Sequence, residues 1–336
     1  MIDNKPLTYK AVNWNEPDNE YITSFWQQNL KQFWIDEEYT PSRDKDGWRT
    51  LSNAFKECYK KVLGGLTLLD TLQGGWGMNN LVNHIESLQN KALVTYMSFI
   101  EEIHAKSYST IFTTLINSNM EINEVFKWVE ENKFLQYKAK KVDEQYQLCK
   151  KDKLTDYELF RVLSASINLE SHLFYSGFYL PLWIAGVDGK LVASSDIIKK
   201  IVQDESLHGG FLGMIARELY LKQDEETQKE WYNWLVEFSL DLHNNEIGYI
   251  EEIYADLNKE VGFDMISEVK DYLKYNFNRA FNNLGFEEYF DVNEINPIVM
   301  NGISLETTQH DFFSKKSTNY EKLVDSEVLD SASDLF

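Results

Sequence analysis

Apolar positions recur at intervals of three and four residues over most of the chain, the spacing of one buried face on an α-helix. The clearest stripe runs between 48 and 72 and comprises Leu51, Phe55, Tyr59, Val62, Leu66 and Leu69. This spacing predicts a helix over 48–72 that ends at Gly74 and Gly75. Because strand-like alternation is confined to short patches, we predict an all-α fold.

Prolines at 6, 17, 41, 181 and 297 leave two long spans without a helix breaker. We expect the other helices at about 21–36, from 78 through His84 to Thr114, and over 121–150, 156–180, 193–222, 225–257 and 264–284. The segment 156–180 is apolar nearly all round, as a central bundle helix should be, and we expect Pro181 and Gly186 to end it. The charges of 138–141 are predicted to form a solvated face.

No Pro-, Gly- or Ser-rich linker divides the 336 residues. We therefore predict one domain over 1–301 and a flexible, polar and acidic C-terminal tail over 302–336. Composition alone makes disorder the simplest interpretation of that tail. Its apolar tip, Leu335 and Phe336, leaves open a second interpretation, in which the tail is a docking peptide.

The charge balance restricts the partners. The chain has 33 basic and 54 acidic residues and a formal net charge of −21, which argues against nucleic acid and anionic membranes. Two cysteines form no disulfide framework, and the chain contains neither a signal-peptide pattern nor an apolar run of about 20 residues. These features predict a cytoplasmic protein with free thiols and no membrane segment.

Two Glu-x-x-His motifs carry the candidate chemistry. They are Glu101 with His104 and Glu205 with His208, and on a helix each pair projects from nearly one face, one turn apart. Two facing helices of this kind, each joined by another helix with a carboxylate, form a carboxylate-bridged two-metal site in a four-helix bundle. The motifs therefore predict a dinuclear metal site in the core.

Each motif is preceded by an acidic residue in apolar surroundings. Asp70 lies 31 residues before Glu101, and Glu170 lies 35 before Glu205. An unpaired carboxylate in such surroundings is costly, and a metal offsets the cost. The six candidate ligands carry a charge of −4, enough to neutralise two divalent ions, and their oxygen-rich composition suits manganese or iron.

The remaining residues near the motifs receive simpler interpretations. Glu102 projects about 100° away from Glu101 on a helix, so we expect it at the surface. None of the other four histidines follows a Glu at this spacing, so we take them as structural: His84, His172, His243 and His310.

Tyr108 follows His104 by four residues and projects from the same helix face. A tyrosine beside a buried, oxidising di-metal site can lose one electron and become a phenoxyl radical, although packing alone also explains a buried tyrosine. Phe174, Phe178 and Ile201 lie at helical spacing from proposed ligands and are candidates for a dry pocket around it.

At these residues the sequence resembles the radical-bearing small subunit of ribonucleotide reductase, of the class Ib kind. The resemblance extends from Trp14 to about Tyr320. It rests on motifs at 33–36, 64–71, 104–109, 173–178, 204–205, 296–297 and 310–313. Several motifs in family order are far more specific than a pair of Glu-x-x-His motifs.

The resemblance implies a ferritin-like helical homodimer with two manganese or two iron ions per subunit and a tyrosyl radical at Tyr108. It implies that Trp34, Asp204 and His104 begin a proton-coupled electron path that Tyr320 continues toward a separate large subunit. There, ribonucleoside diphosphates become deoxyribonucleoside diphosphates. It also implies that the tail docks on the large subunit and that a small flavodoxin-like protein activates the manganese form.

Some residues depart from the family pattern, namely the stretches 73–78 and 138–153 and the position of His172. Two other functions remain open at this point. A di-metal oxidase or oxygenase of the same fold has no need of Tyr320, and an iron-binding or iron-storage protein accumulates many ions per chain.

Overall fold

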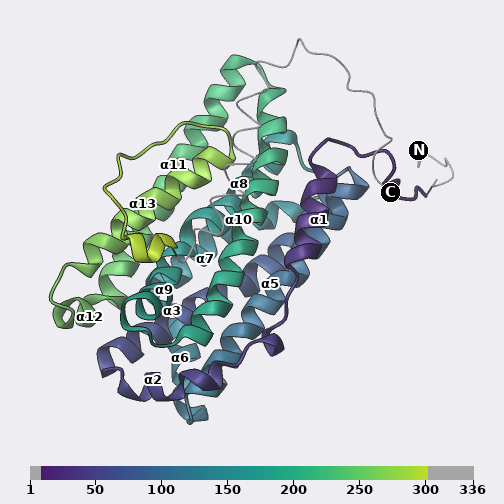
Figure 1. Cartoon of the computed structure of the whole chain (residues 1–336). Coiled ribbons are helices and arrows are strands. Elements are labelled where there is room, and N and C mark those ends of the chain that lie inside the picture. Colours follow the sequence, from purple (N-terminus) through teal and green to yellow (C-terminus); the bar gives the residue numbers. More distant parts are fainter. Residues whose placement is uncertain (1–8, 302–336) are drawn as a thin grey trace, which may run out of the picture.

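Residues 9–301 are described by a computed structural model, and every regular element within that range is helical (Figure 1). The α-helices are α1 (Ile22–Gln32), α2 (Lys45–Thr50), α3 (Asn53–Leu72), α4 (Asn79–Leu81), α5 (Leu88–Leu115), α6 (Asn119–Glu131), α7 (Lys133–Tyr146), α8 (Asp156–Asn168), α9 (Tyr175–Asp188), α10 (Val192–Leu221), α11 (Glu225–Ile253), α12 (Ala255–Glu260) and α13 (Met265–Asn283). The predicted all-α class is confirmed.

Shorter helical turns connect these helices. Two are π-helical, η3 (Gln73–Met78) and η6 (Leu169–Leu173), and four are 3-10 turns: η1 (Asp36–Glu38), η2 (Pro41–Asp44), η4 (Val82–His84) and η5 (Gln147–Lys150). Each π-helical segment directly follows a predicted ligand helix or contains a ligand. Such segments occur frequently at functional sites.

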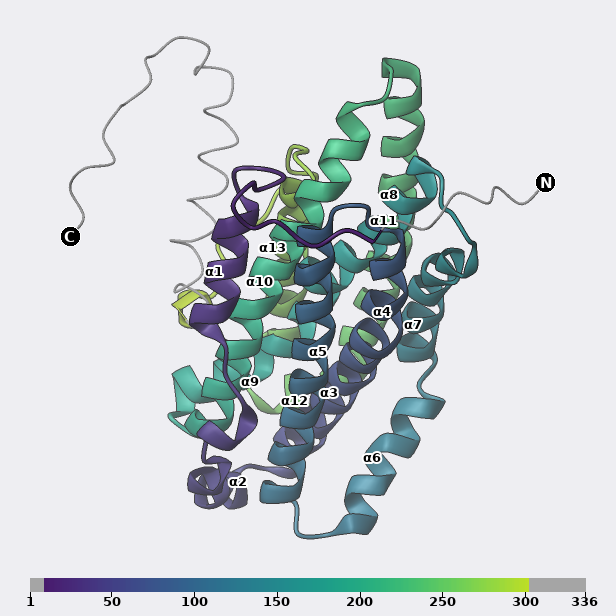
Figure 2. The same cartoon turned by 90° about the vertical axis from the view of Figure 1, so that its right-hand side faces the viewer.

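The long helices lie side by side and form a bundle (Figure 1). Helix α3 packs against α5, and α8 packs against α10, while α9 continues from α8 and also contacts α3. Figure 2 shows α1 alongside α5 and α10, on the outside of the bundle. Buried apolar side chains from all these helices form one continuous core.

Polar caps explain where several helices begin. The side chains of Ser52, Ser87 and Asp224 each accept a hydrogen bond from a backbone N–H in the first turn of α3, α5 and α11. At α8, Thr155 and Glu158 form a reciprocal capping box. These caps satisfy backbone donors that have no partner within the helix.

The helix predicted to run from 78 through His84 to Thr114 is wrong at its start. The chain instead passes through η3, α4 and η4, becomes extended at Ile85, and begins α5 at Leu88. The Ser87 hydroxyl accepts from the Asn90 N–H at 3.0 Å. Because this cap starts a new helix, His84 lies outside the helix that contains the central motif.

The expectation that Pro181 and Gly186 end a helix is also wrong. Helix α9 contains both residues and ends at Asp188, followed by Gly189, which has a left-handed backbone with φ of 62°. Proline removes one backbone hydrogen bond from a helix interior. Every residue from Tyr175 to Ile184 is buried, so packing on all sides stabilises the helix despite that loss.

Two predicted helices are interrupted. The chain between 48 and 72 divides at Leu51 and Ser52 into α2 and α3, and that between 121 and 150 divides at Asn132 into α6 and α7. In the second case the Asn132 side chain accepts from the backbone N–H groups of Phe134 and Leu135 and thereby caps α7. The intervening polar residue therefore starts a new helix.

The predicted solvated face at 138–141 is wrong for Lys138. Its side chain is buried on α7, and its Nζ lies 2.7 Å from the Glu246 carboxylate of α11. Lys138 Nζ also lies 4.0 Å from the centre of the Tyr249 ring. A buried charge requires such partners, and they are contributed by a helix about a hundred residues further along the chain.

Candidate metal centre

Four helical segments bring the six predicted ligands together in the core. They place Asp70 on α3, Glu101 and His104 on α5, Glu170 on η6, and Glu205 and His208 on α10. No side chain of the six is more than 1% exposed. Glu102, in contrast, is exposed, as its position on the helix predicts.

The six residues divide into two groups that share two members. One group contains Asp70, Glu101, His104 and Glu205, and the other contains Glu101, Glu170, Glu205 and His208. Within each group, one ligand atom per residue lies within 4.8 Å of the others. Glu101 and Glu205 therefore stand between two adjacent sites, which is the arrangement that bridging carboxylates require.

The donor atoms fit metal ions because most of them face only one another and lack a well-formed hydrogen bond. Neither carboxylate oxygen of Asp70, Glu101 or Glu205 has a hydrogen bond. Glu170 Oε2, His104 Nδ1 and both ring nitrogens of His208 also lack one. Buried polar atoms are normally satisfied. A dry cluster of unsatisfied oxygen and nitrogen atoms is therefore well suited to two cations with a preference for such ligands.

The charges of this cluster act strongly on one another. Burial lowers the pKa of both imidazoles, but the surrounding carboxylates outweigh it and raise the pKa of His104 and of His208 to about 10. For Glu101, burial raises the pKa, yet His104 and His208 lower it to about 2. Burial and the charge of Glu101 raise the pKa of Asp70 and of Glu205. Without metal, the cluster thus retains protons.

Tyr108 lies on α5 next to this cluster and is fully buried. Its hydroxyl has no hydrogen-bond partner in the described part of the chain. Burial raises the pKa of Tyr108 well above its usual value, and the charges of Asp70 and Glu205 raise it further. The phenol therefore stays protonated, and removing an electron from it requires that its proton leave as well.

A chain of polar contacts leads outward from His104. Asp204 Oδ2 lies 3.1 Å from His104 Nε2 and accepts a hydrogen bond from Trp34 Nε1 at 2.7 Å. The Trp34 and His104 rings stack with centroids 6.0 Å apart. The structure thus brings the predicted residues Trp34, Asp204 and His104 into one chain of contacts.

Two buried glutamines beside these groups are not predicted from the sequence. Gln32 Nε2 donates to Asp204 Oδ1 at 2.8 Å, and Gln73 Nε2 donates to Glu170 Oε1. The only signal was position: Gln73 follows Asp70 by three residues, one helical turn, and Gln32 lies two residues before Trp34. Without the partner's location, neither spacing singles out a functional residue.

The other candidates have different outcomes. Phe174, Phe178 and Ile201 are fully buried, and the two phenylalanine rings lie 6.2 Å apart, but their role around Tyr108 remains a prediction. Tyr320 and the predicted tail, 302–336, lie outside the described residues.

Two of the histidines taken as structural pair with each other. His172 Nε2 lies 3.2 Å from His243 Nδ1, and the rings stack. His84 contacts the Cys149 carbonyl at 2.9 Å, whereas His310 lies outside the described residues.

Comparison with protein families identifies the relatives of this chain. The family model "Ribonucleotide reductase, small chain" matches residues 11–297, most of the sequence. The chain belongs to this family. It is similar to the ribonucleoside-diphosphate reductase subunit beta of Bacillus phage SPbeta, with 43% identity over 96% of this chain and 95% of the relative. The Escherichia coli ribonucleoside-diphosphate reductase 2 subunit beta is 34% identical over 92% of this chain and 93% of the relative.

Among solved structures, dimanganese(II)-NrdF of Streptococcus sanguinis is similar to this small chain. The identity is 39%, the TM-score is 0.81, and the match covers 88% of this chain and all of that one. The resemblance stated from the sequence is therefore confirmed, as is the ferritin-like fold that it implied. Membership of this family disfavours the alternatives of an oxidase or a storage protein. Within residues 9–301, no helix is long and apolar enough to span a membrane.

Proposed function

We propose that this chain is the radical-bearing small subunit of a class Ib ribonucleoside-diphosphate reductase, acting with a separate large subunit. The observation that supports this most directly is the pair of buried ligand groups that share Glu101 and Glu205, beside the buried Tyr108. The whole enzyme would catalyse the reduction of ribonucleoside diphosphates to deoxyribonucleoside diphosphates for DNA synthesis.

The proposed cofactor is a pair of manganese or iron ions. Asp70 and His104 would hold one ion, Glu170 and His208 the other, and Glu101 and Glu205 would contact both. When bound, the two ions supply the oxidising equivalent that removes one electron from Tyr108. His104 would bind through Nδ1, because its Nε2 already faces Asp204. Both metals accept this oxygen and imidazole set, so cellular supply and activation decide between them.

The protein's own residues confine the radical. Burial of Tyr108 excludes water from the phenol, and the Asp70 carboxylate, which interacts with the Tyr108 hydroxyl and raises its pKa, is the nearby group able to take its proton. Phe174, Phe178 and Ile201 are proposed to complete an apolar pocket around the ring. A dry, apolar enclosure protects a radical from reaction with solvent.

The oxidising equivalent is proposed to leave through His104, Asp204 and Trp34. Asp204 contacts both rings, so it can exchange a proton with Trp34 Nε1 when the indole gains or loses an electron. Gln32 holds the second oxygen of the same carboxylate and keeps it oriented. Tyr320 would continue the path to a cysteine of the large subunit, and the tail over 302–336 would dock there.

We further propose that the small subunit is a homodimer in the cytoplasm and that a flavodoxin-like protein activates its manganese form. Helices α1 and α5 are the candidate contacts of the dimer because Leu30 of α1, Phe33 at its end and Phe99 of α5 are exposed by 53%, 46% and 56%. The Tyr96 hydroxyl joins these helices by donating to the Asn29 carbonyl at 2.9 Å. Exposed apolar patches of this kind mark interaction surfaces.

The assignment is tested by assaying the metal-loaded chain with its large subunit and a ribonucleoside diphosphate. We expect deoxyribonucleotide formation from the parent and none from Tyr320→Phe, although both contain the same amount of Tyr108 radical. Full deoxyribonucleotide formation by the Tyr320→Phe variant would show that the path does not pass through Tyr320, and no formation by the parent would favour an oxidase of the same fold. Sedimentation of the parent and of Phe99→Glu tests the proposed dimer. We expect the variant to sediment as a smaller species than the parent.

A further inference from the structure

The stretches 73–78 and 138–153 meet in the core beside the metal centre. Gln73, the first residue of η3, is fully buried. Its Oε1 accepts a hydrogen bond from the hydroxyl of Tyr146 on α7, and its Nε2 donates to Glu170 Oε1. Tyr146 OH also lies 2.9 Å from Ser166 Oγ. An unbroken buried chain therefore links Ser166, Tyr146 and Gln73 to a predicted ligand.

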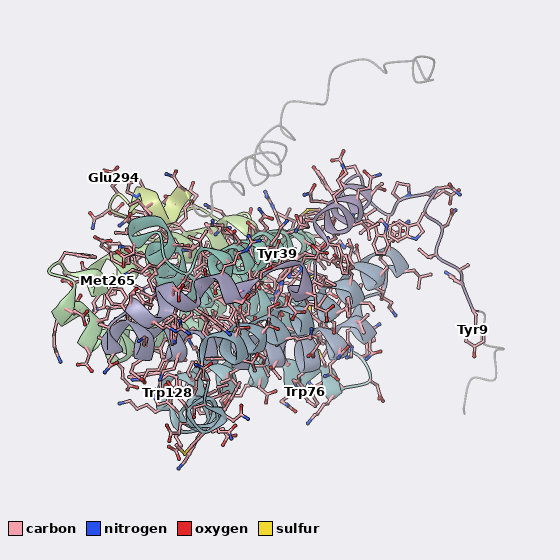
Figure 3. The ribbon with its side chains drawn as sticks, turned by 60° about the horizontal axis from the view of Figure 1, so that its bottom comes forward. Tyr9, Tyr39, Trp76, Trp128, Met265 and Glu294 are labelled. Atoms are coloured by element: carbon pink, nitrogen blue, oxygen red, sulfur yellow. The ribbon has the colours of Figure 1, made fainter. Side chains whose placement is uncertain are left out.

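The glycines of 73–78 permit this close approach. A Cβ at Gly77 would lie 2.7 Å from two atoms of the Tyr146 ring, and one at Gly74 would lie 2.6 Å from Glu101 Cβ. Real Cβ atoms essentially never come so close to other atoms. Gly77 thus leaves room for Tyr146, and Gly74 leaves room for α5. Trp76, which lies between these two glycines in the sequence, is at the periphery of the bundle (Figure 3).

The hydrogen bond distinguishes Glu170 from the other three carboxylates of the centre. Asp70, Glu101 and Glu205 have no hydrogen bond to either oxygen, whereas Glu170 has Oε1 held by Gln73. Its free Oε2 lies 3.5 Å from His208 Nδ1 and belongs to the second ligand group. Glu170 therefore presents one oxygen to the site and keeps the other occupied.

We propose that Gln73 and Tyr146 are positioning residues that orient Glu170, so that it offers a single oxygen to the ion held with His208. The proposal rests on the metal-binding function proposed above. It assigns a role to Gln73 and Tyr146 beyond packing: they act through Glu170 and touch neither ion. Groups that hydrogen-bond to metal ligands fix ligand orientation and raise metal affinity.

The order of the hydrogen bonds explains why two residues are needed. The Gln73 amide has a donating and an accepting end and could face Glu170 with either. Burial raises the pKa of Tyr146 well above its usual value, and the charges of Glu170 and Glu101 add to this, so the phenol remains a donor. With Tyr146 donating to the amide oxygen of Gln73, the NH2 group of Gln73 faces the Glu170 carboxylate, which when ionised can only accept.

The test measures binding of Mn²⁺ to the metal-free full chain, by the loss of the electron paramagnetic resonance signal of free Mn²⁺. The variants are Gln73→Met, which conserves volume, and Tyr146→Phe, which removes one hydroxyl. Tyr254→Phe is the matched control, because Tyr254 is fully buried and its hydroxyl contacts the Ser176 carbonyl at 3.1 Å, outside the metal centre. Thermal unfolding of each variant is measured in parallel.

We expect Gln73→Met to lower the affinity for one of the two Mn²⁺ ions by about 10–100-fold. Tyr146→Phe should lower the affinity for the same ion by about three- to tenfold, which is the effect of losing one hydrogen bond. The double variant should bind no more weakly than Gln73→Met alone, since Tyr146 acts through Gln73. Tyr254→Phe should bind both ions as the parent does.

Equal weakening of both ions, unchanged affinity in the variants, or the same loss in Tyr254→Phe would overturn the proposal. If Gln73→Met does not fold, Tyr146→Phe against Tyr254→Phe still decides it. A parent that binds no pair of ions contradicts the proposed function itself. A parent with two ions and an unchanged Gln73→Met contradicts only the role of Gln73 and Tyr146.

Discussion

Trp34 Nε1 donates a hydrogen bond to Asp204 Oδ2 at 2.7 Å across 170 residues of sequence. The same oxygen lies 3.1 Å from His104 Nε2, so one carboxylate joins an indole to a predicted metal ligand. Both side chains are almost completely buried. The relationship connects the centre of the bundle to the segment between α1 and η1.

Replacing Asp204 by Asn should disrupt this connection while preserving the shape of the side chain. The amide has only one accepting atom and no charge, so it cannot serve Trp34, Gln32 and His104 as the carboxylate does. We expect turnover with the large subunit to fall about 100-fold, while the Tyr108 radical still forms. Asp196→Asn, a change on the same helix, serves as control in the same assay, and an equal loss there would contradict a specific role.

Removing a shared ligand should have a larger effect than removing a ligand of one group. Glu101 belongs to both groups, whereas His208 belongs only to the second. We expect Glu101→Ala to reduce occupancy from two ions to one or fewer, and His208→Ala to leave one ion in place. Metal analysis after dialysis, with circular dichroism to verify folding, measures this. Two ions retained in both variants would refute the ligand assignment.

Metal affinity should rise with pH. In the metal-free protein, His104 and His208 have pKa values of about 10 and carry a proton at neutral pH. Metal binding requires a neutral imidazole nitrogen, so each ion displaces at least one proton. We therefore expect the affinity for each ion to increase by about tenfold or more per pH unit between pH 6.5 and 8.5. Titrations with Mn²⁺ at three pH values measure the slope, and a flat profile would be inconsistent with protonated imidazoles.

Lys138 and Glu246 provide a test of stability away from the metal ligands. Lys138→Met leaves the Glu246 carboxylate buried without its cation, which should lower the free energy of unfolding by about 3–5 kcal/mol. The double change Lys138→Met with Glu246→Gln removes both charges and retains an acceptor for Ser176, 2.5 Å away. Urea unfolding should show that the double variant recovers most of the loss, and no recovery would show that the ion pair is not the cause.

Local patterns were sufficient to predict the helical class and to select the six candidate ligands. Glu101 and Glu205 are identifiable from the Glu-x-x-His spacing, and Asp70 and Glu170 because a carboxylate in apolar surroundings is costly to bury unless it binds a cation. Gln73 and Gln32 were missed because their importance depends on Glu170 and Asp204, which lie 97 and 172 residues away. Lys138 was misassigned for the same reason, since Glu246 is 108 residues distant.

Helix boundaries were less predictable where tertiary packing opposes local preference. Pro181 is a helix breaker in isolation, but complete burial of the surrounding helix outweighs the lost hydrogen bond. The division before α5 depends on a single serine cap, Ser87, in a region whose apolar pattern is continuous. Such features follow from the folded environment rather than from periodicity.

The most direct test of the central claim is an electron paramagnetic resonance spectrum of the full chain beside Tyr108→Phe. Each protein is loaded with ferrous iron in air, and separately with manganese and a flavodoxin-like activator. We predict a tyrosyl signal in the parent and none in Tyr108→Phe, with about two ions bound to both. A signal that persists in Tyr108→Phe, or its absence from the fully loaded parent under both conditions, would contradict the assignment of the radical to Tyr108.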